Sequence, residues 1–186
     1  MKKYPEISIA AVFQNNAKRL ADKAYAAYYS DGKFVDISWS EMNEMVHNLA
    51  YYLLSRGIGK GDKVGIFSPN RYEWHLAALA IHSIGAVDVP IYATNSAQEA
   101  EYILENSDSK LCLVGTKDHL DKVLQVQDRL PLMSGIVAFD EPVMRIEGVI
   151  SLREAMEAGA QKADEPEFDR RLNAIRPDDL ATLIYT

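Results

Sequence analysis

The sequence is short of cysteine and of glycosylation sites. It contains one cysteine, Cys112, and no Asn-x-Ser/Thr motif. One thiol cannot form an internal disulfide, and Cys112 stands in the apolar run Leu111–Val114, so we expect a buried free thiol. Both absences favour a reducing compartment, and we therefore expect the protein in the cytoplasm.

Long hydrophobic runs are also missing. No stretch approaches the roughly 20 apolar residues that a membrane-spanning helix needs. Charged and polar residues interrupt the first 23 residues too early for a signal peptide. We expect a soluble protein, and peripheral contact at the inner membrane surface stays open.

Basic residues are outnumbered by acidic ones. The chain has 20 Lys and Arg against 27 Asp and Glu, which gives a formal net charge of −7. An acidic chain repels an anionic polymer, so we expect no nucleic-acid partner. Of its 186 residues 48% are hydrophobic, which is enough to build a sizeable core.

Strand-like and helix-like patterns alternate from residue 63 onward, and this alternation predicts right-handed crossovers. The expected fold class is α/β, with a largely parallel sheet flanked by helices. The helix over 71–85 is apolar on nearly every side, which indicates that it is covered on more than one side. The predicted strands cover 63–68, 87–92, 110–115 and 135–139, and the predicted helices cover 71–85, 96–107 and 117–130.

The region before the alternation predicts a helix over 7–20 and then a hairpin. Asp31-Gly32 separates two β-prone runs, 25–29 and 34–37, and glycine reaches positive φ without strain. A further helix follows, with Ser40 as its candidate N-cap and Gly57 as its stop.

The last part of the chain is less regular. It predicts a strand fragment at Val149-Ile150, a short helix from Leu152 and then a charged connector. A turn at 176–179 leads into a predicted strand, Leu180–Tyr185. We divide the chain into a helix and hairpin (1–37), an α/β subdomain (38–139), a connector with a short helix (140–175) and a terminal strand (176–186).

Several helix starts carry a Ser or Asn followed three residues later by Glu. This pattern predicts a reciprocal capping box, in which each side chain bonds the backbone N–H of the other residue. The three pairs are Asn70 with Glu73, Ser96 with Glu99 and Ser151 with Glu154.

Two loops resemble ligand-binding loops. The glycine-rich segment 57–63 follows a helix and enters a strand, which is the wrong order for a phosphate loop, so it predicts a turn. The loop after the strand 63–68 has the correct order, and Ser68, Asn70 and Arg71 form a possible site there, because ligands collect beyond the carboxyl ends of parallel strands. Capping by Asn70 explains the same residues without a ligand.

The residues that carry acid–base or metal chemistry do not form a recognisable site. His47, His75, His82 and His119 lack an acid or cysteine cluster at metal-ligand spacing. The sequence has no nucleophile elbow and no thiol–imidazole signature. We therefore assign no metal site and no catalytic residue.

Three segments together resemble the adenylate-forming acyl-CoA synthetases, and within them the long-chain fatty-acid–CoA ligases. They are KGDKVGIFSPNRYEW at 60–74, GAVDVPIYAT at 85–94 and DDLATLIYT at 178–186. The resemblance covers residues 38–115 and 176–186 well and the stretch between them loosely. It implies the amino-terminal part of the large domain of such an enzyme.

The resemblance also implies which functional elements to expect. In this family a strand like LIYT runs into the phosphate loop TSGTTGxPK, whose first threonine matches Thr186. The catalytic and magnesium-binding elements follow that loop, so this chain would be an inactive fragment whose partner is the rest of its own chain. The implied parent uses ATP, Mg²⁺ and CoA to activate a fatty acid, and we expect none of them to bind the fragment tightly.

Two alternatives stay open. The chain could be a non-catalytic α/β binding or interaction module, which the sequence following Thr186 in the gene would reveal. The parent could also activate another carboxylic acid, such as an aryl or amino acid.

Overall fold

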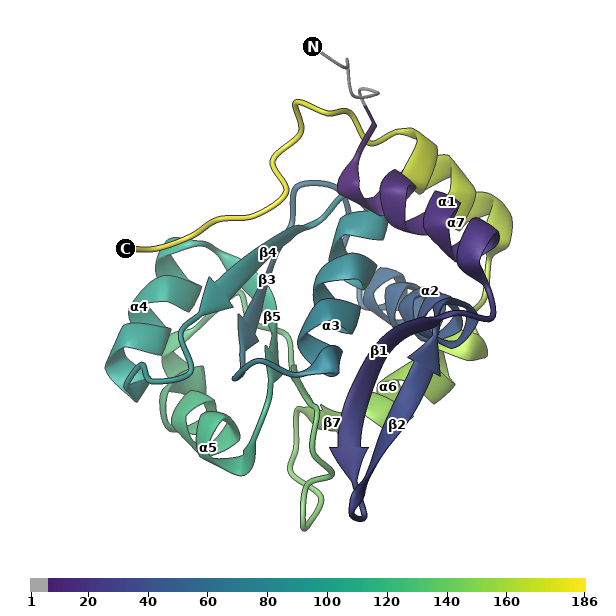
Figure 1. The fold of residues 1–186 in the computed structure, drawn as a ribbon. Helices are drawn as coiled ribbons and strands as arrows, with labels where there is room; N and C mark the ends of the chain where they lie inside the picture. The colour runs from purple at the N-terminus through teal and green to yellow at the C-terminus, as the bar shows by residue number, and fades with distance from the viewer. Residues whose placement is uncertain (1–6) are drawn as a thin grey trace.

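The computed structural model describes residues 7–186, which form a five-stranded parallel sheet and a separate antiparallel hairpin (Figure 1). The sheet has the order β4-β3-β5-β6-β7, and every neighbouring pair is parallel. The predicted α/β class is confirmed. The strands are β3 (Lys63–Phe67), β4 (Val87–Ile91), β5 (Ser109–Val114), β6 (Ile136–Ala138) and β7 (Val149–Ser151).

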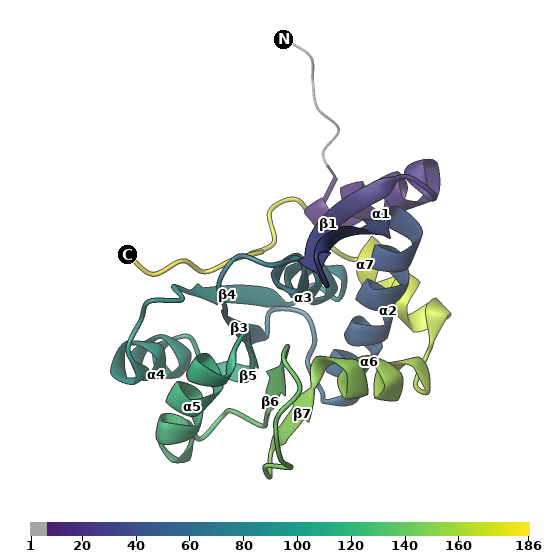
Figure 2. The same ribbon diagram turned by 60° about the horizontal axis from the view of Figure 1, so that its bottom comes forward.

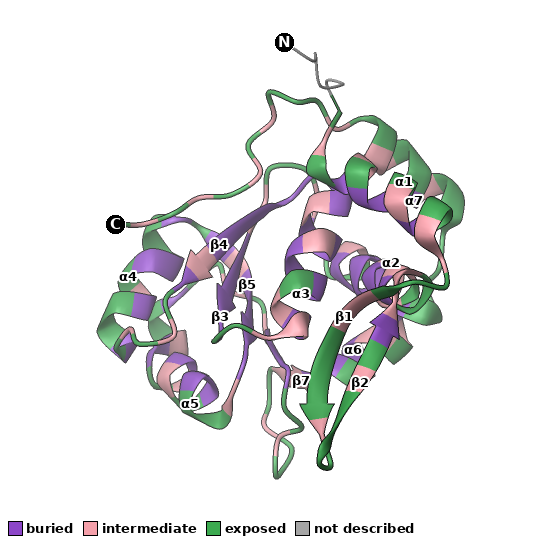
Figure 3. Ribbon diagram, viewed as in Figure 1, coloured by how far each residue is buried: buried purple, intermediate pink, exposed green. Residues whose placement is uncertain are grey.

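Helices cover both faces of this sheet (Figure 2). One face lies under α2 (Trp39–Ser55), α3 (Tyr72–Ser83) and α6 (Leu152–Ala160). The other lies under α4 (Ala97–Asn106) and α5 (Lys117–Val126), which is followed by a 3₁₀ turn, η1 (Gln127–Arg129). Because both faces are covered, the central strands are buried almost throughout, as Figure 3 shows.

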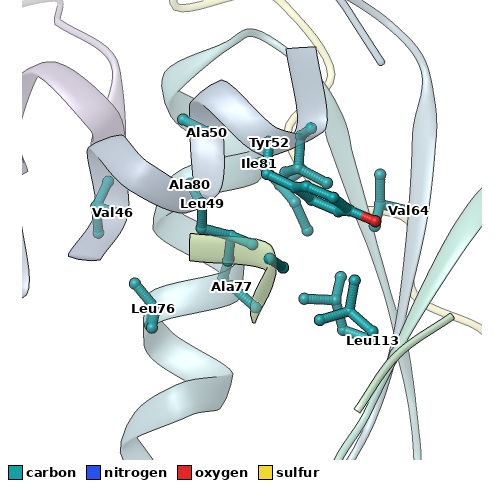
Figure 4. Close-up of a cluster of buried hydrophobic side chains, with 14 of the residues drawn as sticks. Val46, Leu49, Ala50, Tyr52, Val64, Leu76, Ala77, Ala80, Ile81 and Leu113 are labelled. Atoms are coloured by element: carbon teal, nitrogen blue, oxygen red, sulfur yellow. The ribbon is translucent and has the colours of Figure 1, made fainter. Parts of the chain in front are cut away.

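Helix α3 lies at the centre of the molecule. It contacts α1 and α2 as well as β3 and β4 of the sheet. Figure 4 shows Leu76 and Ala77 of α3 beside Leu49 of α2, with Val64 and Leu113 of the sheet close by. The prediction that this apolar helix is covered on more than one side is confirmed.

The N-terminal helix and hairpin form where the sequence predicts them. They are α1 (Ile9–Leu20), β1 (Ala24–Ser30) and β2 (Lys33–Ser38). Asp31 and Gly32 both have positive φ, 50° and 79°, as a two-residue hairpin turn requires. The rings of Phe13, Tyr25 and Trp39 pack against one another at the base of the hairpin.

Two predicted caps are wrong. Ser38, not Ser40, begins α2: it forms a reciprocal capping box with Glu41, while the Ser40 hydroxyl donates to the Ala21 carbonyl at 2.9 Å. Asn70 does not cap α3, because the helix begins one residue later than predicted, with Arg71 at the N-cap position. The Glu73 carboxylate pairs with Arg71 and completes no capping box. The predicted boxes Ser96 with Glu99 and Ser151 with Glu154 are confirmed.

The predicted charged connector contains a helix that the sequence reading missed, α7 (Glu165–Asn173). The Asp164 side chain caps it by accepting from the Glu167 N–H at 3.0 Å, and the Phe168 side chain is fully buried. Helix α2 contacts both the hairpin and α6, so it connects the predicted parts 1–37, 38–139 and 140–175. The boundaries between these parts stay predictions.

The predicted strand Leu180–Tyr185 is also wrong. The segment is extended, but it pairs with β4 at one point only, between Asp88 and Thr182. The Asp88 N–H donates to the Ala181 carbonyl, and the Asp88 carbonyl accepts from the Leu183 N–H. The next donor on this side of β4 would be residue 90, which is a proline without an N–H, so the ladder stops.

Candidate functional site

Arg71 joins three strand ends at the carboxyl edge of the sheet. Its guanidinium donates twice to the Glu73 carboxylate, at 2.7 and 2.8 Å, once to the Gly115 carbonyl at 2.6 Å and once to the Asp140 carboxylate at 2.9 Å. It also lies over the Phe139 ring. The hydrogen bonds to Glu73 raise the pKa of Arg71 above its ordinary value. An anionic ligand would have to displace Glu73, so the geometry favours a structural role.

Ser68 and Asn70 flank this network without sharing one site. Ser68 is buried, and its hydroxyl donates to the Pro69 carbonyl at 2.9 Å. Its side chain fills the space where a side chain on Gly115 would stand. Asn70 is exposed to solvent. The structure thus brings Ser68 and Arg71 together around Gly115. A direct ligand role for Ser68, Asn70 or Arg71 stays a prediction.

Thr186 lies elsewhere. The residue before it, Tyr185, donates its hydroxyl to the side chain of Asn106 at 2.8 Å and packs edge-on against Tyr102. Figure 1 accordingly shows the chain end beside α4, away from the loop that joins β3 to α3. Thr186 itself is exposed, and its predicted place at the start of a phosphate loop stays a prediction.

The terminal segment is held to the sheet edge by a buried carboxylate. Asp88 is 2% exposed, and one of its carboxylate oxygens accepts from the Thr182 hydroxyl at 3.2 Å. Its other oxygen lies 2.5 Å from the Nε2 atom of His82, which stands in the last turn of α3. Together with the two backbone hydrogen bonds of Asp88, this cluster fastens residues 181–183 to β4.

The sequence reading missed this cluster. A signal was present, because Asp88 interrupts an otherwise apolar strand, VDVPI, and a buried carboxylate is costly unless it is hydrogen-bonded. Its partners His82 and Thr182 lie 6 and 94 residues away in the sequence. Periodicity alone could therefore not have assembled them.

The glycine-rich segment 57–63 is a turn, as the sequence predicts. Gly57 and Gly61 have φ of 78° and 81° at the exit from α2 and the entry into β3. Lys60 within it pairs with Asp179 at 2.5 Å and donates to the Ala174 carbonyl at 3.2 Å. Its charge thereby fastens the connection between α7 and the terminal segment.

An apolar pocket of about 320 Å³ lies beyond the carboxyl ends of β5 and β6. Leu120 and Ala138 form part of its wall, and Val143 and Met144 of the following loop cover it. Asp121, Asp140, Glu141 and Lys117 also line it, and Lys117 is paired with Asp121. Acidic groups therefore predominate among its charged residues, which disfavours an anionic ligand.

Neither a metal cluster nor a membrane span is found within residues 7–186. No three or more His, Cys, Asp or Glu side chains of this range are arranged to hold a metal ion. None of its helices is both long and apolar enough to cross a membrane.

His119 is buried and packed, with Nδ1 2.6 Å from the Thr116 hydroxyl and Nε2 3.1 Å from the Ala93 carbonyl.

A family model described as AMP-binding enzyme matches residues 13–186. The chain belongs to this family. The match includes the sheet, both helical layers and the terminal segment, and it leaves out only the residues before Phe13.

Relatives within the AMP-binding family carry one recurrent name. The chain is 35% identical over 167 residues to the long-chain-fatty-acid–CoA ligase FadD15 of Mycobacterium bovis, which covers 89% of this chain and 27% of that protein. It is 28% identical over 183 residues to the long-chain-fatty-acid–CoA ligase ACSBG2 of Xenopus laevis, covering 98% of this chain and 25% of that protein. The chain thus spans about a quarter of the length of these relatives.

Solved structures share the fold. The anthranilate CoA ligase AuaEII in complex with anthranoyl-AMP matches with a TM-score of 0.79 and 20% identity, over 98% of this chain and 33% of its own. A long-chain-fatty-acid-CoA ligase, FadD1 from Archaeoglobus fulgidus, matches with a TM-score of 0.77 and 22% identity, over 99% and 35%. At this identity they establish the fold and nothing more.

Proposed function

We propose that this chain is part of an ATP-dependent fatty-acid–CoA ligase and supplies scaffold to its adenylation site. The observation that carries the proposal is the AMP-binding family match over 13–186, together with 35% identity to a long-chain-fatty-acid–CoA ligase. A fatty acid, ATP and CoA are the corresponding substrates. The rest of the protein would be the principal partner of this chain.

The proposed reaction has two steps. The fatty-acid carboxylate attacks the α-phosphorus of ATP, which forms an acyl-adenylate and releases pyrophosphate. The thiol of CoA then attacks the acyl carbon, and AMP leaves as the thioester forms. Neither step needs a protein nucleophile, because the fatty-acid carboxylate and the CoA thiol are themselves the nucleophiles. Catalysis of the first step rests on positioning and on neutralising phosphate charge.

The described residues fit a scaffold role in this reaction. The Arg71 guanidinium makes four hydrogen bonds, to Glu73, Gly115 and Asp140, so its charge is already paired within the protein. The described residues do not fit Mg²⁺, since no cluster of suitable ligands is found among residues 7–186. The catalytic groups would therefore come from elsewhere in the protein.

The cytoplasm is the proposed location, with peripheral membrane contact as an additional possibility for an enzyme that acts on fatty acids. The buried free thiol of Cys112 supports a reducing compartment, because a sequence with one cysteine forms no internal disulfide that an oxidising compartment would stabilise. Fractionation of cells that express the tagged protein, with and without a salt wash, would separate free from membrane-attached protein.

A paired titration tests the proposal. Mg·ATP is titrated by calorimetry into this 186-residue chain and into the protein expressed from its complete gene, and acyl-CoA and pyrophosphate are measured with palmitate. We expect binding and turnover in the complete protein and neither in the chain alone. Tight ATP binding or turnover by the 186 residues would contradict the scaffold role and return attention to Ser68, Asn70 and Arg71.

The same assay separates the alternatives. A panel of fatty, aryl and amino acids at equal concentration identifies the preferred acid, and a preference for an aryl or amino acid would replace the fatty acid in the proposal. A complete gene product that binds no ATP and activates no acid would favour a non-catalytic module.

A further inference from the structure

The edge strand β4 contains one carboxylate, Asp88, in an otherwise apolar and largely buried sequence. The other residues of β4 are Val87, Val89, Pro90 and Ile91, all apolar. Aspartate is disfavoured in strands, and a buried carboxylate is costly unless its oxygens are hydrogen-bonded. In Asp88 both oxygens are bonded, one to Thr182 and one to His82, so the unfavourable residue is retained together with a specific pair of partners.

Three of the hydrogen bonds of Asp88 reach one short stretch of the terminal segment, residues 181–183. Its N–H and carbonyl bond Ala181 and Leu183 at 3.1 and 2.9 Å, and its side chain bonds Thr182 between them. The stretch gains no further backbone pairing along β4, because Pro90 offers no N–H. Asp88 is therefore the one residue of β4 whose backbone and side chain both hold the segment within residues 7–186.

His82 orients the carboxylate. It stands six residues before Asp88, at the end of the helix that leads into β4, and its Nε2 lies 2.5 Å from the carboxylate. Its Nδ1 is buried and has no hydrogen-bond partner among residues 7–186. A ring that donates from Nε2 and leaves Nδ1 unprotonated fits both observations, because an unpaired acceptor is less unusual than an unpaired donor.

We propose that Asp88, oriented by His82, is a positioning residue that fixes the path of residues 183–186 through Thr182. This inference rests on the proposed function in one respect: the consequence for catalysis assumes that the residues after Thr182 approach the nucleotide. The anchoring itself is a property of this chain and can be measured without any substrate.

The first experiment measures the anchor by amide hydrogen exchange in the 186-residue chain. Thr182→Val removes the hydroxyl and keeps the shape, and Asp88→Asn removes the charge. We expect either variant to speed exchange of the Leu183 amide about tenfold or more, while the Val64 and Leu113 amides in the sheet centre exchange as before. Thr182→Ser keeps the hydroxyl and should keep exchange slow.

Tyr185→Phe is the matched control. It removes a different hydroxyl bond of the same segment, to Asn106, and leaves the Asp88 bonds intact. We expect no change at the Leu183 amide. If Thr182→Val and Asp88→Asn leave that amide unchanged, or Tyr185→Phe speeds it equally, the anchoring role is overturned. Should Asp88→Asn fail to fold, the contrast between Thr182→Val and Thr182→Ser decides.

The second experiment uses the protein expressed from its complete gene. Thr182→Val should raise the KM for ATP about five- to tenfold with a smaller change in kcat, and Thr182→Ser should restore it. Faster exchange with an unchanged KM for ATP would overturn the positioning role in catalysis. An unmodified protein that forms no acyl-CoA would overturn the proposed function, and the exchange result would still stand on its own.

Discussion

Two of the helices that cover the sheet, α3 on one face and α4 on the other, differ in character. On one face, α3 is buried between the sheet and other helices, it is apolar around most of its circumference, and no side chain caps its first turn. On the other face, α4 buries one side, exposes acidic residues on the opposite side, and begins with the capping box of Ser96 and Glu99. A helix enclosed by protein is stabilised by burial, whereas an outer helix depends more on amphipathicity and caps.

The largest expected effect comes from placing a charge in the enclosed layer. Ala80 of α3 is fully buried, and an unpaired carboxylate there would lose its hydration. We expect Ala80→Glu to lower the free energy of unfolding by roughly 3–5 kcal/mol or to prevent folding. The control is Gln98→Glu on the exposed side of α4, which should have little effect in urea denaturation. Equal tolerance of both changes would show that α3 is not enclosed.

A smaller but still large effect is expected where α6 approaches α2. A β-carbon on Gly159 would lie 1.8 Å from the Asn48 carbonyl oxygen, which is backbone and cannot move aside. We expect Gly159→Ala to cost about 3 kcal/mol, although alanine favours a helix over glycine by about 1 kcal/mol. Urea denaturation measures the change.

Gly65 provides the corresponding test toward the other face. Its β-carbon would meet a methyl group of Leu104 of α4 at 2.6 Å, and a side chain can rotate away. We expect Gly65→Ala to cost about 1–2 kcal/mol, less than Gly159→Ala. The reverse order would contradict the view that the α2–α6 contact is the tighter one.

A smaller difference between α3 and α4 is expected from their caps. We expect Ser96→Ala to lower the free energy of unfolding by about 1 kcal/mol, because it removes the bond to the Glu99 N–H. Asn70→Ala, at the start of α3, should change it by less than about 0.5 kcal/mol, because no cap bond is present to lose. Equal losses in thermal or urea denaturation would contradict the cap assignment.

The smallest effect concerns acid stability and α7. Hydrogen bonds from Arg170 and Arg171 lower the pKa of Glu167 from 4.5 to about 2. A lowered pKa stabilises the folded state fully above the unfolded value of 4.5, and this contribution is lost as the pH falls toward 2. We expect Glu167→Gln to flatten the decline of the urea midpoint between pH 5 and about pH 3 by a small amount, since surface pairs are weak and salt-screened.

If the urea midpoint of Glu167→Gln falls with pH as steeply as that of the unmodified chain at low ionic strength, Arg170 and Arg171 do not stabilise the Glu167 carboxylate. The side-chain cap of α7 is a suitable internal check, because the Glu167 N–H can still donate to the Asp164 carboxylate in the variant. A loss of helix content in Glu167→Gln at neutral pH would point to a wider structural role.

Much of the fold follows from the sequence because its patterns are local. The alternation from Lys63 onward predicts the parallel sheet, and Asp31-Gly32 predicts the hairpin. Helix α7 was missed because its sequence is highly charged, with only Phe168 as a fully buried anchor. The terminal strand was wrong because strand formation there depends on the neighbouring edge, where Pro90 stops the ladder.

The candidate site was less predictable. Arg71 was identified, but its hydrogen bonds to Gly115 and Asp140 depend on how the strand ends meet. Thr186 was identified from a resemblance, and its surroundings on α4 were not foreseen. The Asp88 cluster joins a helix end, an edge strand and a segment 94 residues further along the chain, so its assembly is a property of the tertiary structure.

The single cysteine lies in the centre of the sheet, so labelling of its thiol can report transient opening of the structure around it. Cys112 is fully buried in β5, and burial raises the pKa of its thiol to about 12, so almost no reactive thiolate exists in the folded state. It packs in the cluster under α4 and α5, next to Gly65. The rate at which a small disulfide reagent labels Cys112 therefore measures how often α4 and α5 separate from the sheet. No engineered label is needed.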